Sequence, residues 1–279
     1  MDPVVSTAWL SDKLRTPETR IVDGSWHMPA EKRNGREEYL QAHIPGAVFF
    51  DIDAIADHAT DLPHMLPSPE EFARAAGELG LSRDADIVVY DTHGIRSAAR
   101  VWWTLRAMGY TKVHVLDGGL RKWMADGRPI ESGEVYPAKA TVEPAFDADL
   151  VRSAADVRRI IESGEARMVD ARSAGRFAGS APEPRAGLRS GHMPGAANLP
   201  FEQVIAQDGT LKDTSELKAA FKSAGVDLGK PIVTSCGSGV TASVLALALA
   251  RLGLDRTAVY DGSWTEWASL PDTPIVTGA

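Results

Sequence analysis

The residue best suited to chemistry is Cys236, the single cysteine of the chain, which opens the segment CGSGVTA (236–242). Gly237 and Gly239 allow the backbone N–H groups of this segment to turn inward, as in anion-binding nests. An apolar run of helical character, VLALALARLG, follows. The positive end of its dipole would favour the thiolate over the thiol. The segment therefore predicts a nucleophilic cysteine whose charged intermediate is held by a run of loop amides, those of Gly237, Ser238, Gly239, Val240 and Thr241.

Two other interpretations fit a lone cysteine. Cysteine is common as a small buried apolar residue without reactivity. Phosphatases of the Cys-x5-Arg type use a similar loop, but they need an arginine six residues after the cysteine to bind phosphate. That position is Ala242 here, which argues against phosphate-ester hydrolysis.

Composition limits the remaining possibilities. The chain has 279 residues, 44% of them hydrophobic, which is enough for two cores. Its formal net charge is -8 and no basic cluster is present, so nucleic acid is not an expected partner. We see no signal peptide, and no apolar stretch of membrane-spanning length. One cysteine forms neither an internal disulfide nor a thiolate metal cluster, so we expect a cytoplasmic protein with no metal or organic cofactor.

The chain contains one series of motifs twice, in the same order, and five collinear matches predict a duplicated domain. The matching pairs are RIVDGSW (20–26) with ARMVDAR (166–172), AHIPGAVFFD (42–51) with GHMPGAANLP (191–200), PEEFARAAGELGL (69–81) with TSELKAAFKSAGV (214–226), ADIVVYDTHGIRSA (85–98) with GKPIVTSCGSGVTA (229–242), and KVHVLDGGLRKW (112–123) with RTAVYDGSWTEW (256–267).

Each half alternates short β-branched runs with helical patterns. Runs such as IVD, DIVVYD, PIVTS and AVYDG predict buried strands. Ser68 and Glu71 form a capping box, with Pro69 at the first helical position. Gly80 and Gly225 fall where a helix end favours a left-handed residue. This alternation predicts the α/β class, with a parallel sheet flanked by helices on both faces in each half.

The predicted domains are residues 1–135 and 150–279, joined by a linker at 136–149 that contains prolines and no clear periodicity. The two halves differ where the chemistry would lie. Cys236 aligns with Asp91, and Ser238 aligns with His93. Only the second half carries a nucleophile, so the first half is predicted to be a catalytically silent copy.

Two tandem domains, one silent, with CGSGVTA after a strand resemble the rhodanese-type sulfurtransferases over nearly the whole chain. Within that family, thiosulfate enzymes are expected to carry basic residues in this loop, as in CRKGVT. Gly237 and Ser238 are neutral. The motif CG-[ST]-GVT instead resembles the 3-mercaptopyruvate branch.

The resemblance also implies further site residues. Its G-R-F and E-P-R motifs match GRFAGSAPEPR, which transfers substrate binding to Arg176 and Arg185. A planar guanidinium suits the carboxylate and keto oxygen of an α-keto acid, whereas two surface ion pairs would be the alternative. FFDID and PHMLP transfer an aspartate and a histidine to Asp53 and His64, although Pro63 replaces the family's aspartate. Together with Ser238 they would form a relay that moves the substrate's thiol proton.

The implied reaction is ping-pong sulfur transfer. Cys236 would take sulfur from 3-mercaptopyruvate as a persulfide, release pyruvate, and pass the sulfur to cyanide or to a thiol such as thioredoxin or a small thiol. Thiosulfate:cyanide sulfur transfer on the same scaffold is the nearest alternative. A non-catalytic sulfide- or partner-binding module is the alternative from another class.

Overall fold

The computed structural model describes residues 2–14 and 16–278, and these residues form two compact units. Unit 1 comprises residues up to His58, Leu66–Asp147 and Ala206–Leu211. Unit 2 comprises Ala59–Met65, Ala148–Ile205 and the residues from Lys212 onward. Each unit therefore includes a short segment from the other half of the sequence.

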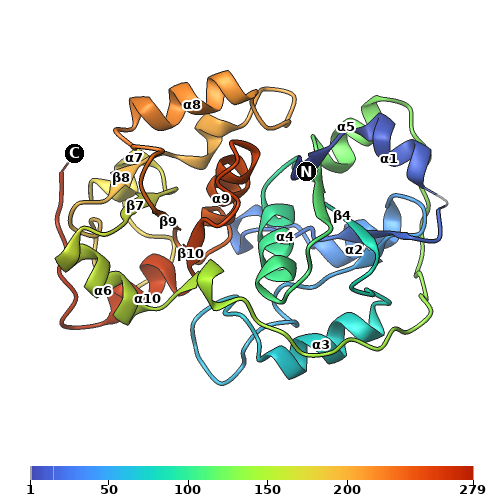
Figure 1. Ribbon diagram of the computed structural model, residues 1–279, viewed down its shortest axis with the longest axis horizontal. Coiled ribbons are helices and arrows are strands. Elements are labelled where there is room, and N and C mark those ends of the chain that lie inside the picture. Colours follow the sequence, from blue (N-terminus) through green and yellow to red (C-terminus); the bar gives the residue numbers. More distant parts are fainter. Residues whose placement is uncertain (1, 15, 279) are drawn as a thin grey trace. The chain divides into compact units, whose positions relative to one another are not determined.

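Unit 1 alternates strands and helices along the chain (Figure 1). Its elements are β1 (Val4–Val5), α1 (Thr7–Lys13), β2 (Thr19–Asp23), η1 (Pro29–Glu31), α2 (Gly35–Gln41), β3 (Val48–Phe49), α3 (Pro69–Glu78), β4 (Asp86–Tyr90), α4 (Ser97–Ala107), β5 (Val113–Leu116) and α5 (Gly119–Ala125).

Unit 2 repeats this pattern. Its elements are η2 (Ala148–Leu150), β6 (Val151–Arg152), α6 (Ala154–Ser163), β7 (Arg167–Asp170), α7 (Ala174–Phe177), β8 (Ala197–Asn198), η3 (Phe201–Val204), α8 (Thr214–Ser223), β9 (Ile232–Ser235), α9 (Ala242–Arg251), β10 (Ala258–Tyr260) and α10 (Ser263–Ser269).

The described residues build one five-stranded parallel sheet in each unit, in the orders β1-β5-β4-β2-β3 and β6-β10-β9-β7-β8. The two orders are the same once the second copy is renumbered, as expected for a duplicated domain. β9 is the central strand of unit 2. From β7 the chain moves to β8 on one side, and from β9 it moves to β10 on the other. The carboxyl ends of β7 and β9 therefore flank a topological switch point, where open α/β sheets place ligands.

Helices cover both faces of the unit 2 sheet (Figure 1). On one face, Val157 and Ile160 of α6 and Trp264 and Trp267 of α10 pack with strand residues such as Val233 in a buried apolar cluster. On the other face, α9 packs against β9 and β10. Because α9 is buried from Ala242 to Ala250, its sequence is apolar on all sides.

The α/β class and the tandem arrangement predicted from the sequence are confirmed. The capping box of Ser68 and Glu71 is present at the start of α3. Gly80 and Gly225 adopt positive φ angles of 67° and 71° directly after helices. The domain boundaries stay a proposal; residues 136–147 of the proposed linker contain neither helix nor strand. Across the residues that the structure describes, helices fall short of the length and apolarity needed to cross a membrane.

Candidate active site

Cys236 directly follows the central strand β9 and is 2% exposed. The loop from Cys236 to Thr241 then leads into α9, which begins at Ala242. Gly239 has a φ of +79°, a conformation that glycine adopts without steric penalty. The predicted strand, loop and helix are all present, and the loop lies at the switch point of the sheet.

A buried serine on another element braces this loop. The backbone N–H groups of Cys236 and Gly239 both donate to Oγ of Ser263, over 3.2 and 3.1 Å. The Ser263 hydroxyl in turn donates to the carbonyl oxygen of Tyr260 over 2.8 Å. One hydroxyl thus uses its donor and two acceptor sites within the loop and its support. Ser263 has a φ of +51°, which is uncommon for a non-glycine residue.

The first turn of α10 also holds the loop through its carbonyl groups. The N–H of Trp264 donates to the carbonyl oxygen of Cys236 over 2.9 Å. The N–H and the hydroxyl of Thr265 both donate to the carbonyl oxygen of Gly237, over 3.0 and 2.6 Å. Because α10 binds the carbonyl groups of Cys236 and Gly237, the loop backbone is held in place by the fold itself. Such preorganisation is what electrostatic catalysis requires.

The matching loop of unit 1 shows what the amides of such a loop can bind. Asp91, which aligns with Cys236, is fully buried after β4. Its carboxylate accepts hydrogen bonds of 2.7–2.9 Å from a set of loop and helix amides, those of His93, Gly94, Arg96 and Ala98. In unit 1, therefore, this loop encloses a negative charge supplied by the chain itself. The aligned positions of unit 2 are Ser238, Gly239, Thr241 and Ser243.

Arg176 reaches the loop of Cys236 from the segment after β7. It belongs to the short helix α7, and its guanidinium lies over Gly237: a Cβ added at Gly237 would be 3.0 Å from Nη2 of Arg176. The side chain of Arg176 is 23% exposed, so part of the guanidinium remains open to solvent. A cation next to the thiol loop is suited to hold an anionic donor.

A buried acid fixes this arginine. Glu183 is 3% exposed at its side chain and accepts from Nη2 of Arg176 over 2.6 Å and from Nη1 of Arg172 over 2.8 Å. Arg172 is itself bound to Asp170 over 2.6 Å, and its guanidinium stacks on Trp264 at 4.2 Å. Burial alone would lower the pKa of Arg172, but the charges of Asp170 and Glu183 outweigh burial and raise it.

The other predicted site residues lie as follows. Ser238 and Val240 are buried in the loop, and Thr241 is half-buried at its end. Arg185 is half-buried two residues after Glu183. His64 is buried, has a φ of 61°, and belongs to the segment of residues 59–65 in unit 2, the unit that contains Cys236. Asp53 belongs to unit 1, where it accepts from the indole N–H of Trp26 over 2.8 Å.

With this geometry described, comparison with known proteins assigns the family. The sequence profile of the rhodanese-like domain matches residues 6–126 and 153–270, once in each half of the sequence. The chain belongs to the rhodanese-like domain family. The resemblance inferred from the motifs is thereby confirmed.

Relatives of this rhodanese-like chain cover almost its whole length. It is 46% identical to the 3-mercaptopyruvate sulfurtransferase of Escherichia coli, over 97% of this chain and 96% of that protein. It is 42% identical to the human 3-mercaptopyruvate sulfurtransferase, over 95% of this chain and 91% of that protein. The crystal structure of SseA from Escherichia coli, a 3-mercaptopyruvate sulfotransferase, matches with a TM-score of 0.87 at 44% identity and covers 95% of this chain and 99% of that one.

Sequence reasoning missed Ser263 and Glu183. Ser263 could have been found from the repeat, because DGSW in the second half replaces DGGL in the first, and the matching Gly119 has a similar φ of +57°. A serine that replaces a glycine at a left-handed position indicates a role for its hydroxyl. Glu183 stands inside the EPR motif, but a buried carboxylate shared by two arginines is visible only once the chain is folded.

Proposed function

We propose that this rhodanese-like protein is a 3-mercaptopyruvate sulfurtransferase that works through a persulfide on Cys236. The observation that carries the proposal is the Arg176 guanidinium against Gly237, next to a thiol in a braced, glycine-rich loop. That arrangement places a carboxylate-binding cation against the residue that directly follows the thiol. The names of its relatives support the same donor.

Arg176 binds the α-keto acid end of the donor. Its free donor atoms suit a carboxylate and the adjacent keto oxygen, which lie in one plane. Arg185 contributes a second guanidinium to the same group. With the keto acid held in this way, the substrate's sulfur is directed to Cys236 and the reaction benefits from orientation.

In the first half-reaction the Cys236 thiolate attacks the sulfur of 3-mercaptopyruvate. An S–S bond forms, the C3–S bond breaks, and its electron pair goes to C3 to give the enolate of pyruvate. The proton of the substrate thiol ends on C3, so the products are pyruvate and the anionic persulfide of Cys236. The loop amides of Gly237, Ser238, Val240 and Thr241 stabilise that anion, whereas the N–H of Gly239 already donates to Ser263. The matching amides of His93 and Arg96 in unit 1 bind Asp91 in this way.

Ser238 and His64 move this proton. Support for this pair comes from the placement of both residues, buried, in the unit that carries Cys236. In the second half-reaction an acceptor thiolate, from thioredoxin or a small thiol, attacks the outer sulfur and restores the Cys236 thiolate. Cyanide serves in the same way and leaves as thiocyanate. A free thiol fits the reducing cytoplasm, where we place the protein.

Thiosulfate is the second candidate donor, since a relative from Arabidopsis thaliana that is 46% identical is named for both donors. The neutral Gly237 and Ser238 disfavour a dianionic donor, so we expect thiosulfate to load the enzyme slowly.

The test is the intact mass of the protein after brief incubation with 3-mercaptopyruvate or with thiosulfate. We expect one added sulfur with 3-mercaptopyruvate and little with thiosulfate. We expect none in Cys236→Ser, because Cys236 is the single cysteine of the chain. Faster loading by thiosulfate would move the protein to the thiosulfate branch. No added sulfur from either donor would overturn the persulfide mechanism and favour a binding module.

A further inference from the structure

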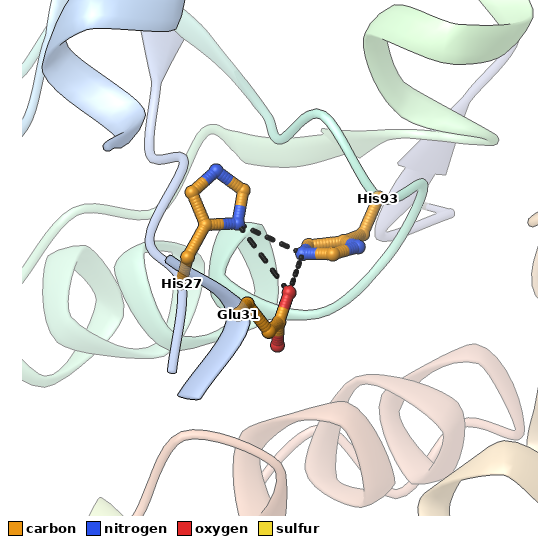
Figure 2. A group of neighbouring side chains, drawn as sticks. All are labelled: His27, Glu31 and His93. Atoms are coloured by element: carbon orange, nitrogen blue, oxygen red, sulfur yellow. Dashed lines mark hydrogen bonds and ion pairs between the residues drawn. The ribbon is translucent and has the colours of Figure 1, made fainter. Parts of the chain in front are cut away.

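The silent unit contains a cluster of possible metal ligands at the same end of its sheet as the catalytic loop in unit 2. His27 follows β2, Glu31 ends η1, and His93 lies in the loop after β4 (Figure 2). His93 aligns with Ser238 of the catalytic loop. We propose that His27, Glu31 and His93 bind a divalent transition-metal ion, with Zn²⁺ as the expected occupant. This inference does not depend on the proposed sulfur-transfer function.

The spacing of the three ligand atoms suits such an ion. Nδ1 of His27 lies 2.9 Å from Nε2 of His93 and 3.8 Å from Oε2 of Glu31. Nε2 of His93 lies 3.2 Å from the same oxygen. Zinc bonds of about 2.0–2.1 Å in tetrahedral geometry separate two ligands by about 3.3 Å. The observed triangle therefore needs shifts of only a few tenths of an ångström to surround a zinc ion.

The His27 ring is fixed in the orientation that a metal requires. Its Nε2 lies 2.9 Å from Oε2 of Glu38, and Arg33 holds that carboxylate with bonds of 2.6 and 2.8 Å. When Nε2–H of His27 donates a hydrogen bond to Glu38, Nδ1 carries a lone pair and accepts from Nε2–H of His93, and an incoming metal ion displaces that one proton. A ligating histidine that donates its second N–H to a carboxylate is the usual outer shell of zinc sites.

A positive charge next to the cluster limits its affinity. Nη1 of Arg96 lies 2.8 Å from Oε1 of Glu31 and 3.4 Å from Nε2 of His93. This guanidinium occupies one carboxylate oxygen and leaves Oε2 for the ion. The side chains of Glu31 and His93 are 27% and 25% exposed, so an ion can enter from solvent. Three protein ligands also leave a fourth position for water or another small ligand.

The sequence alone predicted no metal site because these residues form no local ligand motif. His27 and Glu31 have a spacing seen in many helices, and His93 lies far along the chain. Only the parallel sheet brings the ends of β2 and β4 together, since these strands are direct neighbours.

The test is a Zn²⁺ titration of the full chain in competition with a chromophoric chelator. All variants carry Cys236→Ser, because the thiolate is itself a zinc ligand. We expect one equivalent of Zn²⁺ bound by this parent. Binding should weaken at least about tenfold in His93→Gln and in Glu31→Gln. It should be unchanged in His58→Gln, which alters an exposed histidine of the same unit.

Two further variants distinguish a metal site from a polar cluster. Glu38→Gln should weaken Zn²⁺ binding about 10–100-fold through the ring of His27. Arg96→Gln should tighten it, because the competing charge is removed. Circular dichroism of each variant establishes that it is folded. Absence of Zn²⁺ binding by the folded parent, or equal binding by folded His93→Gln and Glu31→Gln, would overturn the proposal.

Discussion

The guanidinium of Arg176 lies so close to Gly237 that a Cβ there would meet Nη2 at 3.0 Å. A contact of this length forces a neighbour to move. A shift of Arg176 would strain its ion pair with Glu183, which binds Nη2 over 2.6 Å. Gly237 is therefore needed for the position of the arginine, in addition to the conformation of the loop.

Gly237→Ala should weaken donor binding by displacing Arg176. The φ of Gly237 is not in the left-handed region, so the backbone accepts alanine and the fold should be preserved. We expect KM for 3-mercaptopyruvate to rise roughly three- to tenfold with a smaller change in kcat, because ground-state binding is what is lost. The measurement is steady-state kinetics of Gly237→Ala, Arg176→Lys and the double variant. If the two changes act through one contact, their effects will not add, whereas additive effects would contradict this explanation.

Glu183→Gln should affect both stability and donor binding. The neutral amide keeps the shape of the side chain but leaves Arg172 and Arg176 with one negative charge fewer in a buried network. Breaking one partner of such a network destabilises by about 3–5 kcal/mol. We expect a lower thermal midpoint together with a higher KM for 3-mercaptopyruvate. Glu202→Gln, at an exposed position of the same unit, is the control and should change neither.

Ser263 offers a test that separates backbone strain from hydroxyl function. Both Ser263→Ala and Ser263→Gly remove the acceptor that binds the N–H groups of Cys236 and Gly239. Glycine also relieves the φ of +51°, as Gly119 does in the silent copy. We expect similar losses of kcat in both variants and a glycine variant that is more stable than the alanine variant by about 1 kcal/mol. Full activity in either variant would show that the hydrogen bonds from Cys236 and Gly239 to the Ser263 hydroxyl are not needed for activity.

Most of the fold could be predicted from the sequence because the repeat supplies each pattern twice. The strand before Cys236, the capping box at Ser68 and the left-handed Gly80 follow from local rules of hydrophobic period and capping. The sequence could not predict which unit each segment joins. Residues 59–65 come from the first half of the sequence but belong to unit 2, and residues 206–211 come from the second half but belong to unit 1. Local patterns carry no information about which core a loop joins.

The candidate site could be predicted only as far as its motifs reach. Cys236 stands out by its type and its glycine-rich segment, whereas Arg176 was implied only by the resemblance of GRFAGSAPEPR to a family motif. The proximity of Arg176 to Gly237, the residue after Cys236, depends on the neighbouring strands β7 and β9, which only the sheet order brings together. The same limit applies to Glu183, because its ion pairs with Arg172 and Arg176 form only in the folded chain.

Asp91→Ala should destabilise unit 1 by exposing a set of buried amides without an acceptor. Four N–H groups lose a charged partner, and the expected loss is at least about 3 kcal/mol. Formate, which matches the deleted carboxylate, should restore part of the thermal midpoint at concentrations where chloride does not. Asp91→Asn keeps the space filled and should show no formate effect. Equal responses of Asp91→Ala and Asp91→Asn to formate would count against an anion-binding loop.

Asp23 should make the protein less stable as pH rises from about 4 to about 6. Burial, aided by the nearby charge of Asp91, raises the pKa of this carboxyl from 3.8 to about 6 against the hydrogen bonds from Ser25. Between these two values the folded state keeps a proton that the unfolded state has lost, so stability falls with pH; above about 6 the penalty is constant. At about 1.4 kcal/mol per pH unit, the penalty approaches about 3 kcal/mol.

Asp23→Asn removes this ionisation and keeps an acceptor for the N–H of Ser25, which lies 2.8 Å from Oδ1. Urea unfolding at about pH 4 and about pH 7 should therefore show a stability advantage of Asp23→Asn over the parent that is small at the lower pH and largest at the higher one. Asp156→Asn is the matched control of opposite sign, because the backbone hydrogen bond from Ser153 lowers the pKa of Asp156. Its stabilising charge is present at neutral pH and is lost as pH falls through that lowered pKa, so this variant should be less stable than the parent at about pH 7. Parallel pH profiles for the parent and Asp23→Asn would mean that folding does not raise the pKa of Asp23.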